Sequence, residues 1–244
     1  MNCPTFPKAH GFATVTLMLF LPVICLILFS FAFVSYVIQF KTKLRSHCFT
    51  ESMAIEKKLI QSDERLFKLN ALVFSLRFQM KAALAELALA LATENPALIG
   101  AAEMKIQKIK TEQLNLDKVQ RTLIQSTEAQ TKIRTAQLQA ELSRIGNEIN
   151  LVWSFYIQGF TTTRQINETK MAVKPDSPDV APAYELDSNY KQLQTVAYKW
   201  QQRFRSKSEA QDFLKSENIF EMSCSSTAEK KGSQWQILIN ADKF

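Results

Sequence analysis

The chain has 244 residues, of which 46% are hydrophobic, and it carries a net charge of +7 at pH 7. Only five glycines occur. Because glycine alone reaches positive φ angles at little cost, their scarcity argues against a fold of many tight turns and favours long helices. The basic residues form no stripe with interleaved aromatic residues, which argues against nucleic-acid binding and indicates a solvated helical surface.

Residues 11–40 form a run without a charged side chain, GFATVTLMLFLPVICLILFSFAFVSYVIQF. The run is longer than the apolar core of a secretory signal peptide, about 7–15 residues, and it does not end in small residues. It is long enough for a transmembrane helix, which needs about 20 apolar residues, and such helices tolerate an internal proline. We therefore predict an N-terminal tail over residues 1–10 and one retained transmembrane helix over residues 11–40.

Residues 41–160 are predicted to form a long antiparallel helical hairpin with a coiled-coil-like seam. The chain breaks at TENPALIG, because the residue before a proline leaves the α region and Pro96 suits the first turn of a helix. We expect one helix to end near Thr93 and the next to begin near Pro96. Apolar residues recur at spacings of mostly three and four, at Ile55, Leu59, Leu66, Leu69, Val73, Leu76, Met80, Leu84, Leu87, Leu91, Ile106, Ile109, Leu116, Val119, Leu123, Leu138, Leu142, Ile145, Ile149, Val152 and Tyr156.

This seam has polar interruptions. Ser62 places one polar layer in the first arm, and the stretch QSTEAQTK, residues 125–132, crosses the seam of the second arm. Because polar side chains bury less apolar surface, we expect this stretch to be the weakest part of the helix pairing.

The end of the second arm is rich in aromatic residues, LVWSFYIQGF. Two straight arms would return this segment to the level of Phe40, and hence to the membrane surface, where Trp and Tyr prefer to lie. Trp153, Phe155 and Tyr156 are therefore candidate membrane-interface residues. The alternative is a local core formed against the C-terminal segment.

Residues 161–188 contain three prolines and no glycine, which predicts a proline-containing linker or a segment that wraps a surface. Residues 189–244 are predicted to form a small α+β part. Its first helix follows the apolar spacing from Tyr190 to Phe204, and SEAQ caps a short second helix over residues 208–215. Strands are expected at Ile219–Ser225 and Gln234–Asn240, around a turn at Lys231 and Gly232.

The predicted fold class is therefore mainly α. A transmembrane helix continues into a long antiparallel helical hairpin, and the small C-terminal part adds two helices and a β-hairpin.

Four cysteines occur, with Cys3 in the tail and Cys25 in the predicted span. Cys48 and Cys224 remain in the body. In an oxidising compartment these two would be a natural disulfide pair. The alternative is that they are two unrelated free thiols.

The sequence offers no recognised catalytic or metal-binding constellation. The two histidines, His10 and His47, flank the predicted span away from any Ser/Asp arrangement. No Cys-x-x-Cys, His-Glu-x-x-His or glycine-rich phosphate loop occurs. Glu56 and Asp63 each have another acidic residue nearby and are expected on solvated helix faces. We therefore expect no enzyme activity and no catalytic, cofactor-binding or metal site.

The start of the uncharged run carries a glycine-to-proline spacing, from Gly11 to Pro22, with Val15, Leu19 and Leu21 between them. It resembles the N-terminal segment of TadE/TadG-like proteins of tight-adherence (Flp) pilus assembly over about the first 50 residues of this chain. In some members, a glutamate stands where this chain has Thr16, and the pattern is that of a processed prepilin. By this resemblance, a processing site would lie at Gly11 and Phe12. Members without the glutamate are the closer comparison. The matching positions are Gly11, Val15, Leu19, Leu21 and Pro22.

The resemblance implies a structural, minor-pilin-like component of a tight-adherence-type pilus or secretion assembly in the bacterial inner membrane. Its partners would be membrane lipid, other assembly proteins and further copies of itself.

The resemblance places the body in the periplasm, whereas Lys41, Lys43 and Arg45 after the span favour the cytoplasm by the positive-inside rule. Alternatives are a periplasmic adaptor of an export pump and a coiled-coil scaffold anchored in the inner membrane.

Overall fold

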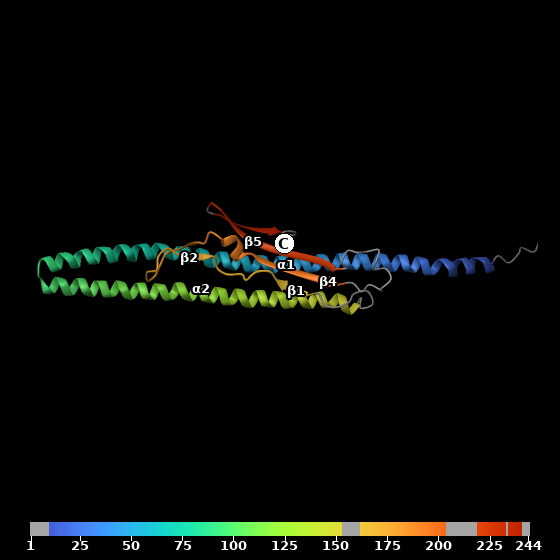
Figure 1. Cartoon of the computed structure of the whole chain (residues 1–244), viewed down its shortest axis with the longest axis horizontal. Coiled ribbons are helices and arrows are strands. Elements are labelled where there is room, and N and C mark those ends of the chain that lie inside the picture. The colour runs from blue at the N-terminus through green and yellow to red at the C-terminus, as the bar shows by residue number, and fades with distance from the viewer. Residues whose placement is uncertain (1–9, 153–161, 204–218, 233, 241–244) are drawn as a thin grey trace, which may run out of the picture. The chain divides into compact units, whose positions relative to one another are not determined.

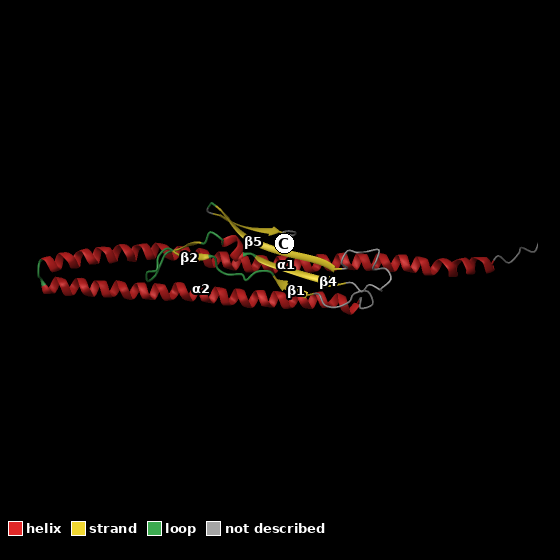
Figure 2. Cartoon of the chain, in the orientation of Figure 1, coloured by secondary structure: helices red, strands yellow, loops and turns green. Residues whose placement is uncertain are grey.

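The computed structural model describes residues 10–152, 162–203, 219–232 and 234–240. The chain divides into two compact units, residues 1–46 and 47–244. Helices dominate the described residues, with a small β part near the C-terminus (Figure 2). The mainly helical fold class is thereby confirmed.

Two long helices are separated by a short break. Helix α1 runs over His10–Ala92 and α2 over Pro96–Val152. Glu94 adopts a positive φ of 49°, which ends α1, and the Asn95 side-chain Oδ1 accepts a hydrogen bond from the Ala97 amide at 3.1 Å, which caps the start of α2. The break lies where the proline rule predicts it. We refer to residues 93–95 as the hairpin tip.

From His47 onward, α1 packs along α2 through the predicted seam. Buried residues of both helices form one cluster that includes Val73, Leu76, Ile106, Ile109 and Leu116. The prediction is wrong at three seam positions, Leu84, Leu91 and Val119, whose side chains are exposed. The neighbouring residues are buried in their place, since a helix of 3.6 residues per turn drifts away from a strict heptad; these are Ala83, Ala90 and Gln120.

In and just after the polar stretch of α2, the residues that face α1 are threonines. Thr127, Thr131 and Thr135 are all buried, and they repeat every fourth residue along one face. The Thr127 hydroxyl donates a hydrogen bond to the hydroxyl of Ser62, 3.1 Å away. The expected polar layer at Ser62 therefore has a matching polar residue on the other helix.

The C-terminal part contains two antiparallel sheets and one short helix. Strands β1 (Thr162–Gln165), β4 (Val196–Arg203), β5 (Ile219–Lys231) and β6 (Gln234–Asn240) form a four-stranded sheet in the order β1-β4-β5-β6. Strands β2 (Val173–Pro175) and β3 (Tyr184–Leu186) pair separately, and α3 covers Tyr190–Gln194. In Figure 1, β4 and β5 lie along the part of the hairpin that is farther from its tip.

The predicted β-hairpin is confirmed. Strand β6 has the predicted bounds, β5 is longer than predicted, and Gly232 adopts a φ of +63° in the turn between them. The predicted helix from Tyr190 to Phe204 is wrong from Val196 to Arg203, which form β4, and Phe204 lies outside the described residues. Val196, Tyr198 and Trp200 alternate along β4 and are buried, and their pairing with β5 outweighs the helical spacing. The predicted helix over residues 208–215 lies outside the described residues.

Candidate functional site

The first compact unit contains a helical segment whose apolar side chains are bare. From Leu17 onward, α1 includes an 18-residue window with a mean hydropathy of 2.9, none of which is buried. The core helix of a soluble protein would be mostly buried, whereas none of this window is. By its length and composition, the segment is long and apolar enough to cross a membrane. The Ser30 hydroxyl donates to the Leu26 carbonyl at 2.8 Å, which satisfies a polar group within the apolar segment.

The candidate processing and interface residues fall at the margins of what is described. Gly11 and Phe12 lie in the first turn of α1, which begins at His10. Trp153, Phe155 and Tyr156 lie outside the described residues. Their predicted place at a membrane interface therefore stays a prediction.

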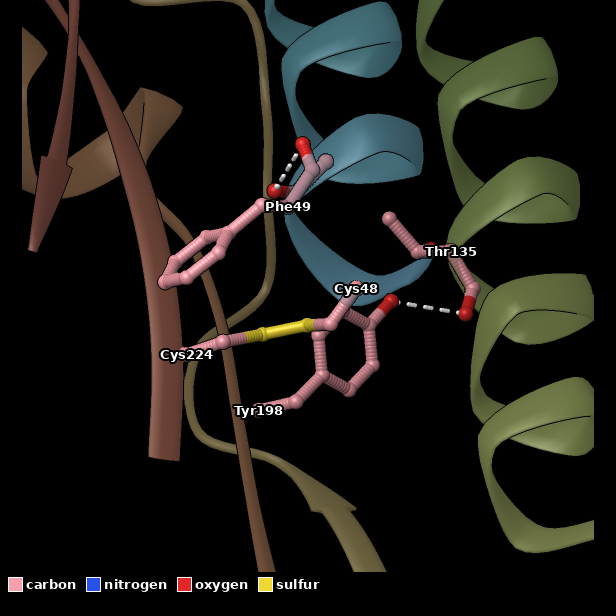
Figure 3. Close-up of a disulfide and its surroundings, with 6 residues drawn as sticks. Cys48, Phe49, Thr135, Tyr198 and Cys224 are labelled. Carbon is pink, nitrogen blue, oxygen red and sulfur yellow. Dashed lines mark hydrogen bonds between the residues drawn. A yellow bond between two sulfur atoms is a disulfide. The ribbon is translucent and has the colours of Figure 1, made fainter. Parts of the chain in front are cut away.

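Cys48 and Cys224 form a disulfide that joins α1 to β5, with their Cα atoms 6.5 Å apart (Figure 3). Both cysteines are fully buried. Tyr198 pairs with Cys224 across β4 and β5, and its hydroxyl donates to the Thr135 carbonyl on α2 at 2.7 Å. Burial raises the pKa of the Tyr198 hydroxyl, so it remains a donor. The sheet is therefore fastened to both helices at one level.

Further along α1 from the disulfide, two carboxyl groups face the C-terminal part. Glu56 and Asp63 are fully buried, which contradicts the expectation of solvated helix faces. A Glu56 oxygen accepts the Val196 amide at 3.2 Å, and an Asp63 oxygen accepts from the side-chain amide of Gln194. The two acids lie seven residues apart, so they share one face of α1. They hold the junction between α3 and β4 against the helix.

Burial governs the charge of these acids. It raises the pKa of Glu56 to about 9 and that of Asp63 to about 7, against the weaker opposing effect of their hydrogen bonds. Within the described residues, the second oxygen of each carboxyl has no hydrogen-bond partner. Desolvation of an ionised carboxylate without full compensation is costly, so Glu56 keeps its proton at neutral pH.

We expect the conversion of Glu56→Gln to flatten the dependence of stability on pH. In the wild type, Glu56 of the unfolded chain loses its proton above its usual pKa of 4.5, whereas the folded chain holds it to about pH 9. The stability that this proton supports is therefore present below pH 4.5 and is lost as the pH rises through 9. Glutamine never ionises, so the stability of the variant relative to the wild type should be constant below pH 4.5, rise as the pH increases from 4.5 to 9, and reach a gain of several kcal/mol near pH 9.

Urea unfolding of both proteins over this pH range measures the difference. Asp63 titrates in both proteins, and its negative charge is one of the causes that raise the pKa of Glu56, so the difference between the two profiles includes this coupling. Parallel pH profiles for the two proteins would show that Glu56 is not held protonated.

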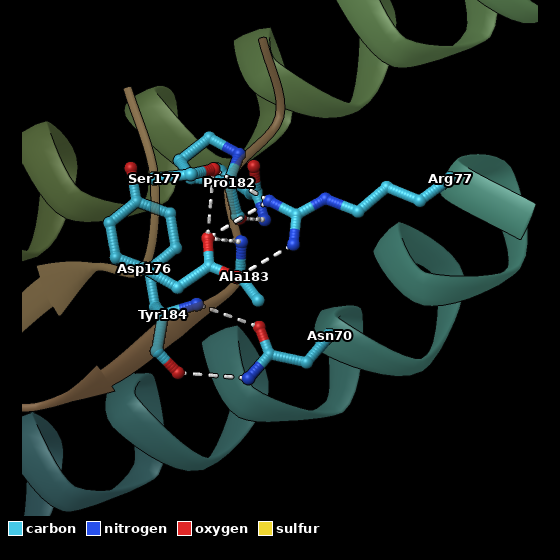
Figure 4. Close-up of polar contacts among 8 residues, drawn as sticks. Asn70, Arg77, Asp176, Ser177, Pro182, Ala183 and Tyr184 are labelled. Atoms are coloured by element: carbon cyan, nitrogen blue, oxygen red, sulfur yellow. Dashed lines mark hydrogen bonds and ion pairs between the residues drawn. The ribbon is translucent and has the colours of Figure 1, made fainter. Parts of the chain in front are cut away.

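The segment between residues 161 and 188 is not an independent linker. Its strands β2 and β3 and the loop between them lie on the hairpin (Figure 4). Arg77 donates two hydrogen bonds to the Asp176 carboxylate at 2.6 and 2.9 Å, and this pairing lowers the pKa of Asp176 to about 2. Ala181 and Ala183 belong to the same buried cluster as the helix seam. The surface-wrapping interpretation of this segment is therefore the correct one.

Side-chain amides of both helices hold this loop. The Asn70 amide of α1 donates to the Tyr184 carbonyl at 2.8 Å and accepts from its backbone amide at 2.9 Å. The Gln120 amide of α2 donates to the Pro182 carbonyl at 3.0 Å. One loop thus ties α1 to α2 midway along the hairpin.

Sequence reasoning missed Glu56, Asp63, Asn70 and Gln120 as structural contacts. A signal was present for the two acids, because their spacing of seven residues keeps both on one helical face. The described residues contain no group of three or more His, Cys, Asp or Glu side chains that could hold a metal ion. Comparison of the chain with protein-family models, with curated proteins and with solved structures gave no match.

Proposed function

We propose that this protein is a membrane-anchored structural component of a bacterial tight-adherence-type pilus or secretion assembly. The observation that carries the proposal is the bare apolar segment of α1, followed in the chain by a helical hairpin that is braced by a disulfide, buried polar contacts and a wrapping loop. Such a body holds a fixed shape over a long distance, as a structural component requires. The pilus-type assembly follows from the resemblance of the segment around Gly11 and Pro22 to TadE/TadG-like proteins.

The body is assigned to the periplasm and the anchor to the inner membrane. A disulfide persists in an oxidising compartment and is rare in the cytosol, and the Cys48–Cys224 bridge is fully buried within the fold. The basic residues after the span favour the opposite orientation by the positive-inside rule, but that rule is a bias. The disulfide is therefore the stronger argument.

The anchor is tested by alkaline extraction of membranes from cells that express the full chain. We expect the protein to stay in the membrane pellet and a C-terminal reporter that is active only outside the cytoplasm to be active. Mass spectrometry of the mature N-terminus then decides between a chain that begins at Met1 and one cut at Gly11 and Phe12. Recovery in the soluble fraction would contradict the proposal.

The assembly role is tested by deleting the gene in the native host and counting surface pili. We expect pili to be lost and the full chain to restore them. The matched control replaces residues 1–40 by a cleavable signal peptide, which delivers the body without its anchor. Restoration of pili by this control would show that the anchor is dispensable and would contradict the proposal.

A further inference from the structure

The wrapping loop, residues 176–184 after β2, covers only part of the hairpin face to which it binds. Asn70 and Arg77 hold the loop by hydrogen bonds (Figure 4), and their spacing of seven positions keeps them on one face of α1. Two alanines of the loop lie in the buried cluster of the helix seam. Leu84, seven positions beyond Arg77, continues the same face but is 51% exposed. The face that binds the loop therefore continues beyond it towards the hairpin tip.

An open groove of about 740 Å3 lies where the loop ends. Apolar side chains of three elements line it, namely Met80 and Leu84 of α1, Leu114 of α2 and Val180 of the wrapping loop. Leu114 and Val180 are 59% and 47% exposed. In Figure 1, the described strands do not extend along the helices to the hairpin tip. We refer to this site as the distal groove; the described residues leave its apolar lining open to solvent.

Two lysines from opposite helices line the distal groove without a counterion. Lys81 of α1 and Lys110 of α2 are exposed. Among the described residues, neither forms an ion pair or a hydrogen bond. The acidic residue of α1 that is nearest to Lys81 in sequence, Glu86, is already held by Lys105 at 2.7 Å. Two positive charges therefore face the groove unpaired.

The other charged groups of the distal groove do not cancel these charges. Arg77 also lines the groove, and it donates two hydrogen bonds to Asp176 in the wrapping loop. Asp179 is the acidic residue among the lining side chains. One carboxylate thus stands against two unpaired ammonium groups, so the groove has an excess of positive charge. Its electrostatic complement is an acidic ligand.

The undescribed segments of the second compact unit are too short to occupy the distal groove. Leu84 lies 36 positions after Cys48 along α1, which is about 54 Å at 1.5 Å per residue. The longest such segment, residues 204–218, has both ends in the sheet, where Arg203 of β4 pairs with Ile219, five positions before Cys224. A loop of this length with its ends together reaches about 27 Å. The lengths therefore favour an occupant from another molecule.

We propose that the distal groove binds an acidic segment of another protein in an extended conformation, as the neighbouring part of the hairpin binds the wrapping loop. In the loop, a carboxylate pairs with an arginine of α1 and small apolar side chains lie against the seam. In the distal groove, Lys81 and Lys110 pair with the carboxylates of the segment, and Leu84 and Leu114 contact its apolar side chains. The inference rests on the proposed function in one respect, which is that the segment belongs to an assembly partner.

A peptide with the sequence of residues 175–184, PDSPDVAPAY, tests this chemistry on the purified full chain in lipid nanodiscs. The chain's own loop resists displacement because it is tethered, so the peptide is directed to the distal groove. Fluorescence anisotropy of the labelled peptide should show saturable binding. Replacing both aspartates of the peptide by asparagine should lower its affinity about tenfold. Absence of saturable binding, or equal affinities of the two peptides, would overturn the proposal.

Matched variants of the full chain locate the site. Leu84→Asp and Lys81→Glu should each lower the affinity for the acidic peptide about tenfold, because both place a negative charge in the groove. Leu89→Asp on α1 and Lys108→Glu on α2 alter exposed residues outside the groove lining, and both should bind the peptide as the wild type does. Equal losses in the variants and their controls would place the peptide elsewhere and overturn the proposal.

The pilus assay separates this inference from the proposed function. In the deletion host, the Leu84→Asp chain should stay in the alkaline membrane pellet but restore few pili, whereas the Leu89→Asp chain should restore them. Full restoration by Leu84→Asp would overturn the role of the groove in assembly and leave the anchored structural role intact. If the wild-type chain itself proves soluble or unnecessary for pili, the proposed function fails, and the peptide assay still decides whether the groove binds acidic segments.

Discussion

Replacing Leu76 by aspartate is expected to unfold the helical hairpin. Leu76 is 3% exposed and lies in the buried cluster shared by α1, α2 and the wrapping loop. The substitution removes a buried leucine and places an unpaired carboxylate in an apolar environment, and we expect a loss of about 4 kcal/mol or more. Because single domains are stable by only about 5–15 kcal/mol, the variant should lose most of its cooperative thermal transition in far-UV circular dichroism.

Leu84→Asp is the matched control. Both leucines belong to the heptad-like pattern in the sequence, but Leu84 is 51% exposed in the structure. An exposed aspartate keeps its hydration, so the control should lose less than about 1 kcal/mol. Equal melting temperatures for the two variants would contradict the packing described for this part of the hairpin.

Removal of the disulfide is expected to have the second-largest effect. Cys48 and Cys224 are separated by 176 positions, and a cross-link that closes so long a loop restricts the unfolded chain strongly. We expect the double substitution of Cys48→Ala and Cys224→Ala to lower the free energy of unfolding by about 2–5 kcal/mol. Urea unfolding of the oxidised proteins in detergent measures this difference.

Gel mobility gives an independent readout of the same bond. The wild type should migrate differently with and without reductant, and the double variant should not. Cys25→Ala is the control, since Cys25 is a free, exposed cysteine in the apolar segment, and it should behave as the wild type in both assays. A mobility difference that persists in the double variant would show that another pair of cysteines is bonded.

The sequence predicts the helical part well because its signals are local. Thr93 and Pro96 bracket a break that backbone sterics impose without help from the rest of the chain. The apolar period of three and four residues likewise reports which face of each helix is buried. It fails at Leu84 and Leu91, because alanine seldom registers in an apolar pattern although Ala83 and Ala90 are the residues that fit between the helices.

The C-terminal part is harder to predict because its structure depends on distant partners. The residues from Val196 to Trp200 fit a helix or a strand by spacing, and only pairing with β5 and cover by α1 select the strand. Glu56 and Asp63 have the composition of a solvent face, and only the positions of Val196 and Gln194, far along the chain, bury them. The spacing of seven residues places both acids on one face of α1, but it does not say which distant segment covers that face.

The position of the Cys48–Cys224 bond determines how a mechanical load passes through this protein. Tension between the chain before Cys48 and the chain after Cys224 is transmitted by one covalent S–S link, so residues 49–223 are shielded from it. For the same reason, a single peptide-bond cut at the hairpin tip would leave two pieces that remain covalently joined. A single cut anywhere between residues 49 and 223 therefore leaves the body covalently joined to the apolar segment of α1.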